Sequence, residues 1–224
     1  MRIAALYDVH GNLPALEAVL EEVEGQDVDE IVFGGDIAAG PFPKQTLELV
    51  RSLDAHCIRG NADRKYTGTP DAIWVWEQLS EDEVAWLEGL PGELVLGDAL
   101  FVHAAPGSDE EIITPATTDE RLSGLLEGIE HRLVVAGHTH MQQDRRVGEI
   151  RFVNPGSVGM PYEEQPGAYW AIVGEDLEFR RTEFDLEAAA ESIRASGWPV
   201  AEEFARKNVL TIPTRDQATA VFGG

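Results

Sequence analysis

Seven polar side chains in this sequence have the types and the spacing of metal ligands. They are two aspartates, one asparagine and four histidines: Asp8, His10, Asp36, Asn61, His103, His138 and His140. Two pairs, in "DVH" and "HTH", are separated by one residue, and side chains two positions apart on an extended segment point to the same side. Imidazole, carboxylate and amide groups without thiolate suit divalent metals such as manganese, iron or zinc. Seven ligands exceed the need of one tetrahedral ion, so the sequence predicts two ions bridged by one carboxylate.

The histidine pair in "AGHTH", at positions 136–140, also has a simpler interpretation as a polar loop after the apolar run "RLVV". The ordered set of "DVH", "GGD", "GN", a lone histidine and "GHTH", each at the end of an apolar run, favours metal ligands instead. His56 and His131 have no acidic or histidine neighbour at ligand spacing, so we expect both to lie partly exposed near strand starts.

Alternating strand and helix signals position these side chains in the first half of the chain. The apolar runs "RIAALYD", "EIVFGGD" and "AHCIRGN" are separated by the helical patterns "ALEAVLEEVEG" and "KQTLELVRSL". Asn12 has the position of an N-cap, and Pro14 that of a first-turn proline. This succession predicts a largely parallel sheet with helices outside it. Sites in such sheets lie beyond the carboxyl ends of the strands, where Asp8, Asp36 and Asn61 stand.

The second half of the chain is dominated by strand signals. It is preceded by a helical segment at about 64–90, in which Ser80 and Glu83 form a capping box. From residue 93 onward short apolar runs alternate with turns, and a helix at about 186–207 precedes a polar tail. No repeat or linker divides the sequence. It therefore predicts one α/β domain over residues 1–224 with a small helical insertion at about 64–90.

Composition narrows the classes of function. The chain has 224 residues, with 17 Lys and Arg against 41 Asp and Glu, so its net charge is −24. Such a surface repels nucleic-acid phosphates and argues against a sequence-specific nucleic-acid-binding protein. Bound divalent cations would invert the local field and admit an anionic substrate. No apolar run approaches the ~18 residues of a membrane span. No signal peptide is evident, and the single cysteine, Cys57, fits a reducing cytoplasm.

The motifs together resemble the calcineurin-like metallophosphoesterase family, and most of all its small bacterial and archaeal phosphodiesterases. The resemblance rests on "DVHGN", "GGD", "RGNAD", "VHAAP" and "GHTH" and extends from residue 1 to about 185. The segment "NPGSVGMP" at 154–161 is also similar, and we expect Gly156 and Gly159 to form turns close to the metal site. The family fold is a four-layer αββα sandwich of two mixed sheets flanked by helices.

The resemblance also implies roles for single residues. By motif position, one ion is held by Asp8, His10 and His140, and the other by Asn61, His103 and His138. Asp36 bridges the two ions. Arg59 matches a position whose guanidinium contacts the substrate phosphate, which makes Asp36, Asn61 and Arg59 the candidate catalytic residues. A surface ion pair is the alternative role for Arg59.

Three positions depart from the family pattern. Ala62 stands where many members have a histidine that assists the leaving group, and Asp63 loses the usual partner of its carboxylate. General-acid assistance contributes about 10²–10⁴ in rate, so diesters and anhydrides fit better than alkyl monoesters. Tyr7 replaces a frequent serine. Tyr162 stands where relatives often carry an arginine, so a phosphate contact is expected to be missing.

The predicted insertion is rich in aromatic residues. Tyr66, Trp74, Trp76 and Trp86 could form a wall on which a nucleobase stacks. Packing of the insertion onto the sheets is the alternative, and the large area that aromatic side chains bury favours it.

The sequence thus predicts a dinuclear phosphoesterase in which a metal-bridging hydroxide attacks small phosphodiesters, nucleotidic ones included. Manganese is the first candidate metal, with iron, zinc, cobalt and nickel as alternatives. A small phosphorylated molecule is the expected partner, without a membrane, and the oligomeric state is left open. The alternative is a catalytically weak protein of the same fold that serves as an interaction scaffold, which the loss of the histidine at Ala62 would favour.

Overall fold

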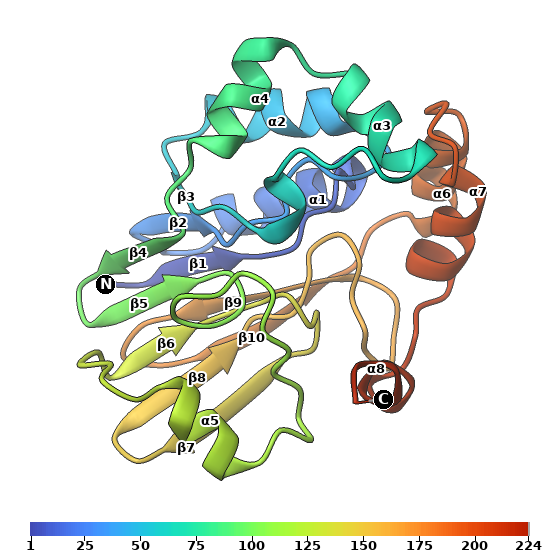
Figure 1. Ribbon diagram of the computed structural model, residues 1–224. Coiled ribbons are helices and arrows are strands. Elements are labelled where there is room, and N and C mark those ends of the chain that lie inside the picture. The colour runs from blue at the N-terminus through green and yellow to red at the C-terminus, as the bar shows by residue number, and fades with distance from the viewer. Residues whose placement is uncertain (224) are drawn as a thin grey trace.

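The computed structural model describes residues 1–223 and contains two five-stranded sheets (Figure 1). The first has the order β10-β9-β1-β2-β3, with the bounds β1 Ile3–Leu6, β2 Glu30–Phe33, β3 His56–Cys57, β9 Ala168–Val173 and β10 Glu178–Thr182. The second has the order β4-β5-β6-β8-β7, with the bounds β4 Glu93–Leu96, β5 Ala99–Val102, β6 Leu133–Val135, β7 Gln143–Val147 and β8 Ile150–Asn154. Both sheets are mixed: β1, β2 and β3 are parallel in the first, and β5, β6 and β8 are parallel in the second.

Helices cover the outer faces of the two sheets. The helices are α1 Leu13–Glu24, α2 Pro43–Ser52, α3 Pro70–Glu77, α4 Glu81–Glu88, α5 Asp119–Leu125, α6 Leu186–Arg194, α7 Ala201–Phe204 and α8 Arg215–Phe222. Figure 1 shows α1 to α4 on the side of the first sheet and α5 on the side of the second. The predicted αββα sandwich is therefore confirmed.

Three apolar clusters correspond to the three boundaries between these layers. Trp170 and Leu16 belong to the cluster between the first sheet and its helices, and Leu122 to the one beneath α5. Tyr7 and Phe101 lie in the cluster between the sheets. The Tyr7 hydroxyl donates a hydrogen bond to the Val135 carbonyl at 3.0 Å, so this tyrosine connects the two sheets.

Strand register brings the carboxyl ends of the parallel strands to one edge. Leu6 pairs with Phe33, and Phe33 with Cys57, so the chain leaves β1, β2 and β3 at the same level. In the second sheet, Phe101 at the end of β5 pairs with Val135 at the end of β6. The segments that follow these five strands carry all seven candidate ligands.

The helices at the C-terminal end differ in part from those that the sequence predicts. The predicted helix over 186–207 is broken after α6, where Gly197 takes a φ of 84° and Pro199 follows. It resumes as α7 and a π-helical segment, Ala205–Leu210. The sequence predicted a polar tail after residue 207. The structure instead has helix α8 there, and Thr214 and Gln217 form a capping box at its start. Within residues 1–223, no helix has the length and hydrophobicity needed to cross a membrane.

Candidate metal centre

Six carboxylate and imidazole side chains converge at this edge of the sheets in two groups. One group is Asp8, His10 and His140, and the other is Asp36, His103 and His138. Within each group, one ligand atom per residue lies within 4.8 Å of the others. Five of the six residues are buried, although all six are polar. The first group has the three residues that the family resemblance implies for one ion, whereas the second has His103 and His138 of the other implied set together with Asp36.

The Asp36 carboxylate lies between the two groups. Its Oδ2 is 3.6 Å from Nε2 of His10 and 3.5 Å from Nε2 of His103. Its other oxygen, Oδ1, accepts a hydrogen bond from the backbone N–H of Ala62 at 2.7 Å. One oxygen therefore fixes the carboxylate, and the other faces both groups, as a bridging ligand requires.

Backbone carbonyls orient two of the imidazoles. Nδ1 of His103 lies 2.8 Å from the Gly34 carbonyl oxygen, and Nδ1 of His140 lies 2.7 Å from that of Met160. A carbonyl can only accept, so Nδ1 carries a proton in both rings, and in the neutral form of each ring Nε2 keeps its lone pair. Both Nε2 atoms face the acidic centre, at 3.9 Å and 3.5 Å from Oδ1 of Asp8.

One oxygen of Asp8 is left without a hydrogen-bond donor. Oδ2 accepts from the backbone N–H of His138 at 2.9 Å, whereas the buried Oδ1 has no hydrogen-bond partner within residues 1–223. A buried, unsatisfied carboxylate oxygen is costly, and a cation among these imidazoles would satisfy it. The donor set, with neutral nitrogen and anionic oxygen, fits divalent metal ions.

The protonation states of His10, His138 and Asp8 favour metal binding as well. Burial lowers the pKa of His10 to about 4, and burial together with the neighbouring His103 lowers that of His138. Both rings are then neutral at pH 7, which is the form that binds a metal. Burial opposes ionisation of Asp8, but the neighbouring His140 holds the pKa of Asp8 below its usual range. Burial also opposes protonation of His103, but Asp36 and Asp8 raise its pKa.

The backbone at the candidate ligands is unusual. Among residues 1–223, the only residues other than glycine with positive φ are Asp8, His10, Asp36, His138 and His140, with values from 48° to 67°. Residues other than glycine rarely adopt this left-handed backbone conformation, and such backbone strain is concentrated at functional sites. Our expectation that each pair converges through an extended segment is thus wrong: left-handed turns bring the pairs together.

Neighbouring backbone holds these turns in place. The N–H of His10 donates to the Asp36 carbonyl at 2.8 Å, and the N–H of Gly159 donates to that of Asp8 at 3.0 Å. Gly159 approaches so closely that a Cβ there would lie 1.8 Å from the Val9 oxygen. Asn12 caps α1 and donates from Nδ2 to the Gly159 carbonyl at 2.9 Å. The segment "NPGSVGMP" therefore supports the loop that carries Asp8 and His10.

Asp63 has a role that the sequence did not reveal. Its carboxylate accepts three backbone hydrogen bonds, from Asp36 at 2.8 Å, from Ile37 at 2.9 Å and from Gly60 at 2.9 Å. Burial, with the negative charge of Asp36, raises its pKa to about 7. Asp63 is thus not deprived of partners by the alanine at 62, because it connects the loop of Asp36 to the loop of Asn61. Its position two residues after Asn61 was the only signal in the sequence.

Asn61, Arg59 and Tyr162 are the three remaining positions for which the sequence predicted a role at the site, and each has different contacts. Asn61 begins a 3₁₀ turn, Asn61–Asp63, and its Oδ1 is 3.0 Å from Nε2 of His103. Arg59 uses one guanidinium nitrogen away from the ligand groups: its Nη1 donates to the Glu88 carbonyl at the end of α4, at 2.9 Å. Tyr162 stacks on His140 with the ring centroids 4.9 Å apart, and burial raises its pKa to about 12, so it remains neutral.

Comparison with known proteins places this geometry in a class. Residues 1–176 match the family described as "Calcineurin-like phosphoesterase superfamily domain". Because this match spans most of the chain, the protein belongs to the calcineurin-like phosphoesterase superfamily.

Individual relatives fit the small bacterial and archaeal subgroup. The chain is 27% identical over 181 residues to phosphodiesterase YfcE of Escherichia coli strain K12, covering 75% of this chain and 85% of that protein. It is 28% identical over 226 residues to an uncharacterized protein of Methanocaldococcus jannaschii, covering 85% and 91%. The crystal structure of a metallophosphoesterase from Sphaerobacter thermophilus is similar with a TM-score of 0.78 at 28% identity, covering 94% and 99% of the two chains.

Proposed function

We propose that this protein is a dinuclear metal-dependent phosphodiesterase that hydrolyses small phosphodiesters. The observation that supports it most strongly is the Asp36 carboxylate, whose Oδ2 lies at 3.5–3.6 Å from one imidazole of each group. Membership of the superfamily supports hydrolysis of phosphoesters, and the likeness to YfcE supports diesters.

In this proposal the seven candidate ligands bind two ions. Asp8, His10 and His140 would hold one ion, Asn61, His103 and His138 would hold the other, and Asp36 would contact both. When bound, such ions would supply polarisation of the phosphoryl oxygens and a lowered pKa of the attacking water. The proposed first metal is manganese. The carbonyls of Gly34 and Met160 keep the rings of His103 and His140 aimed at the centre.

Residues on the substrate side restrict the leaving group. Ala62 lies beside the centre and has no proton to donate, and the phenol of Tyr162 stacks on a candidate ligand. The reaction therefore favours esters whose leaving group departs as a stable anion, because assistance from a general acid is missing.

Hydrolysis of bis(p-nitrophenyl) phosphate by the purified protein tests this function. We expect no turnover after chelation and restored turnover on addition of Mn²⁺. Activity that survives complete removal of metal would contradict the dinuclear mechanism. Absence of turnover with every divalent metal would favour the scaffold, for which the alanine at 62 and the engaged guanidinium of Arg59 are the supporting observations.

Substitution of Ala62→His tests the restriction on the leaving group. The new imidazole would stand beside Asn61, and we expect it to raise alkyl monoester hydrolysis about 10-fold or more, and diester hydrolysis less. The measurement is kcat/KM for both substrate types, with Ala62→Gln as a control of similar polarity that donates no acidic proton. An equal change for both substrates would speak against a missing general acid.

A further inference from the structure

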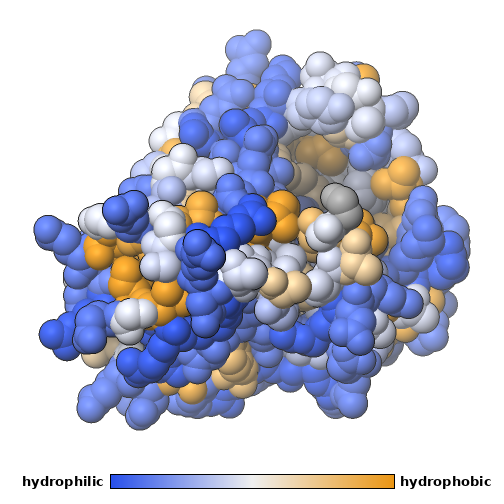
Figure 2. Space-filling model, turned by 60° about the horizontal axis from the view of Figure 1, so that its bottom comes forward, coloured by the Kyte–Doolittle hydropathy of each residue, from blue (hydrophilic) through white to orange (hydrophobic). Residues whose placement is uncertain are grey.

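A cavity of about 570 Å³ adjoins the candidate metal centre. Asn61 and Ala62 form part of its wall, so it opens next to the second group of ligands. Figure 2 shows that one face of the molecule is mostly hydrophilic, with smaller hydrophobic areas. The volume lies in the range of cavities that bind a small organic molecule.

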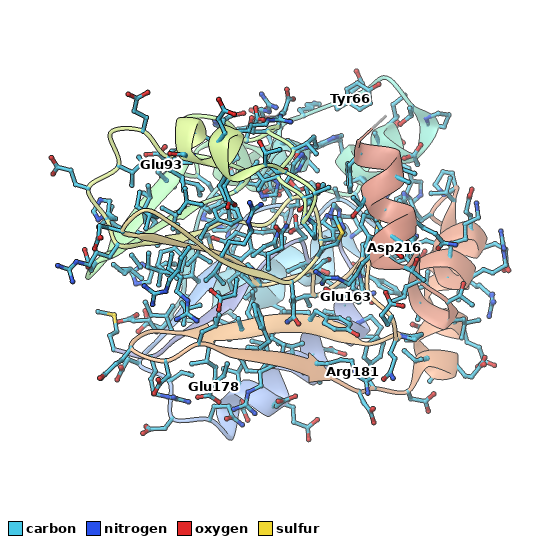
Figure 3. The ribbon with its side chains drawn as sticks, turned by 90° about the horizontal axis from the view of Figure 1, so that it is seen from below. Tyr66, Glu93, Glu163, Glu178, Arg181 and Asp216 are labelled. Atoms are coloured by element: carbon cyan, nitrogen blue, oxygen red, sulfur yellow. The ribbon has the colours of Figure 1, made fainter. Side chains whose placement is uncertain are left out.

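Three aromatic side chains line this cavity, and they come from distant parts of the sequence. Tyr66 lies on the loop before α3 (Figure 3), Trp76 belongs to α3, and Trp198 precedes α7. The indole N–H of Trp198 donates to the Asp71 carbonyl at 3.2 Å, which holds the C-terminal segment against α3. Trp198 was not among the aromatic residues that the sequence singled out.

The aromatic residues of the insertion therefore have different roles. Trp86 does not line the cavity and packs near α2, with the Arg51 guanidinium 5.5 Å from its ring. Trp76 is 7% exposed and belongs to the apolar core beneath α3, so it packs and lines the cavity at once. Tyr66 is 59% exposed, so its ring is accessible to a molecule in the cavity that it lines.

Charged groups around the cavity indicate what would bind there. Lys65 also lines it and forms no ion pair within residues 1–223, unlike the other two lysines, Lys44 and Lys207. Arg64 is paired with Glu110 at 2.6 Å, so their charges largely cancel. Asp71 adds a carboxylate that can accept hydrogen bonds. Flat aromatic surface, hydrogen-bond acceptors and one free cation suit a nucleoside with a phosphate.

We propose that this cavity is a subsite for the nucleoside portion of a nucleotide phosphoester. The base stacks on the aromatic wall of Tyr66, Trp76 and Trp198, and the ester phosphate lies at the metal centre beside Asn61. Lys65 contacts a phosphate oxygen. This inference rests on the proposed function, because only a phosphoesterase centre gives the phosphate its place.

Equilibrium binding without turnover tests the subsite. The probes are adenosine 5′-monophosphate and ribose 5-phosphate, titrated by calorimetry into the Mn²⁺-loaded protein. Stacking of one base corresponds to roughly 10- to 100-fold in affinity, so we expect the adenosine compound to bind at least 10-fold more tightly. Equal affinities, or no binding of either probe, would overturn the subsite.

Three variants test whether the cavity causes the preference for adenosine 5′-monophosphate over ribose 5-phosphate. Tyr66→Ala changes an exposed side chain and should reduce the ratio of the two affinities several-fold, as should Trp198→Leu. Trp86→Phe is the matched control outside the cavity and should leave the ratio unchanged. An unchanged ratio in Tyr66→Ala and Trp198→Leu would overturn the proposal. Failure of the proposed function appears separately, as absence of metal-dependent hydrolysis in the wild-type protein.

Discussion

The Asp36→Asn variant is expected to lose more than about 100-fold of the metal-dependent diesterase activity. Substitutions that only support a metal ligand already cost about 10–100-fold, and Asp36 faces both groups of ligands directly. The amide has the shape of the carboxylate and keeps one oxygen for the Ala62 N–H, which it meets at 2.7 Å in the wild type. The expected loss therefore arises from the missing charge and bridging oxygen, and not from misfolding.

Metal content and activity are measured together for this variant. We expect fewer than two Mn²⁺ ions per chain by elemental analysis, with a thermal transition in chelator close to that of the wild type. Asp54→Asn, at an exposed turn, is the matched control and should retain both metal and turnover. Wild-type activity in Asp36→Asn would eliminate the bridging role.

Replacement of Asp63 by alanine is expected to lower the free energy of unfolding by at least about 3 kcal/mol. Three backbone N–H groups, of Asp36, Ile37 and Gly60, lose their acceptor, and each buried unsatisfied donor costs about 1–3 kcal/mol. For a chain of this size, such a loss lowers the Tm by roughly 6–12 °C.

Urea unfolding in the presence of chelator measures this effect without a contribution from metal binding. Asp63→Asn keeps one oxygen as an acceptor and should lose less stability than Asp63→Ala. The alanine variant should also bind Mn²⁺ more weakly, because the loops of Asp36 and Asn61 are no longer connected. A change below about 0.5 kcal/mol, the size of an ordinary surface substitution, would show that water replaces the carboxylate.

Local signals in the sequence predicted a largely parallel sheet and the positions of the ligand candidates, whereas the four-layer arrangement was implied by the family resemblance. Apolar runs mark the strands, and each polar ligand candidate stands at or just beyond the end of such a run, as Asp8 does after β1 and His103 after β5. In a parallel arrangement these ends meet at one edge. The convergence of the ligand candidates at one edge therefore follows from periodicity and from the order of the elements, whereas the strand order of the two sheets does not.

Other features depend on tertiary contacts that leave no local signal. The left-handed backbone conformation of His138 and His140 is one such feature, because the residue types in "GHTH" do not predict it. The guanidinium of Arg59 meets a carbonyl of α4, nearly thirty residues further along the chain. Trp198 reaches the cavity only because the segment before α7 returns to α3. Helix α8 was missed because it has only eight residues, of which four are polar.

The candidate ligands belong to segments that follow strands of both sheets. Asp8, His10, Asp36 and Asn61 follow strands of the first sheet, whereas His103, His138 and His140 follow strands of the second. Two bound ions would thus act as cross-links between the sheets, joining positions as far apart in the chain as 8 and 140. A ligand that binds only the native state stabilises it in proportion to the logarithm of its free concentration. The resistance of this protein to unfolding would then vary with the supply of divalent metal around it, and metal-starved chains would be the first to unfold.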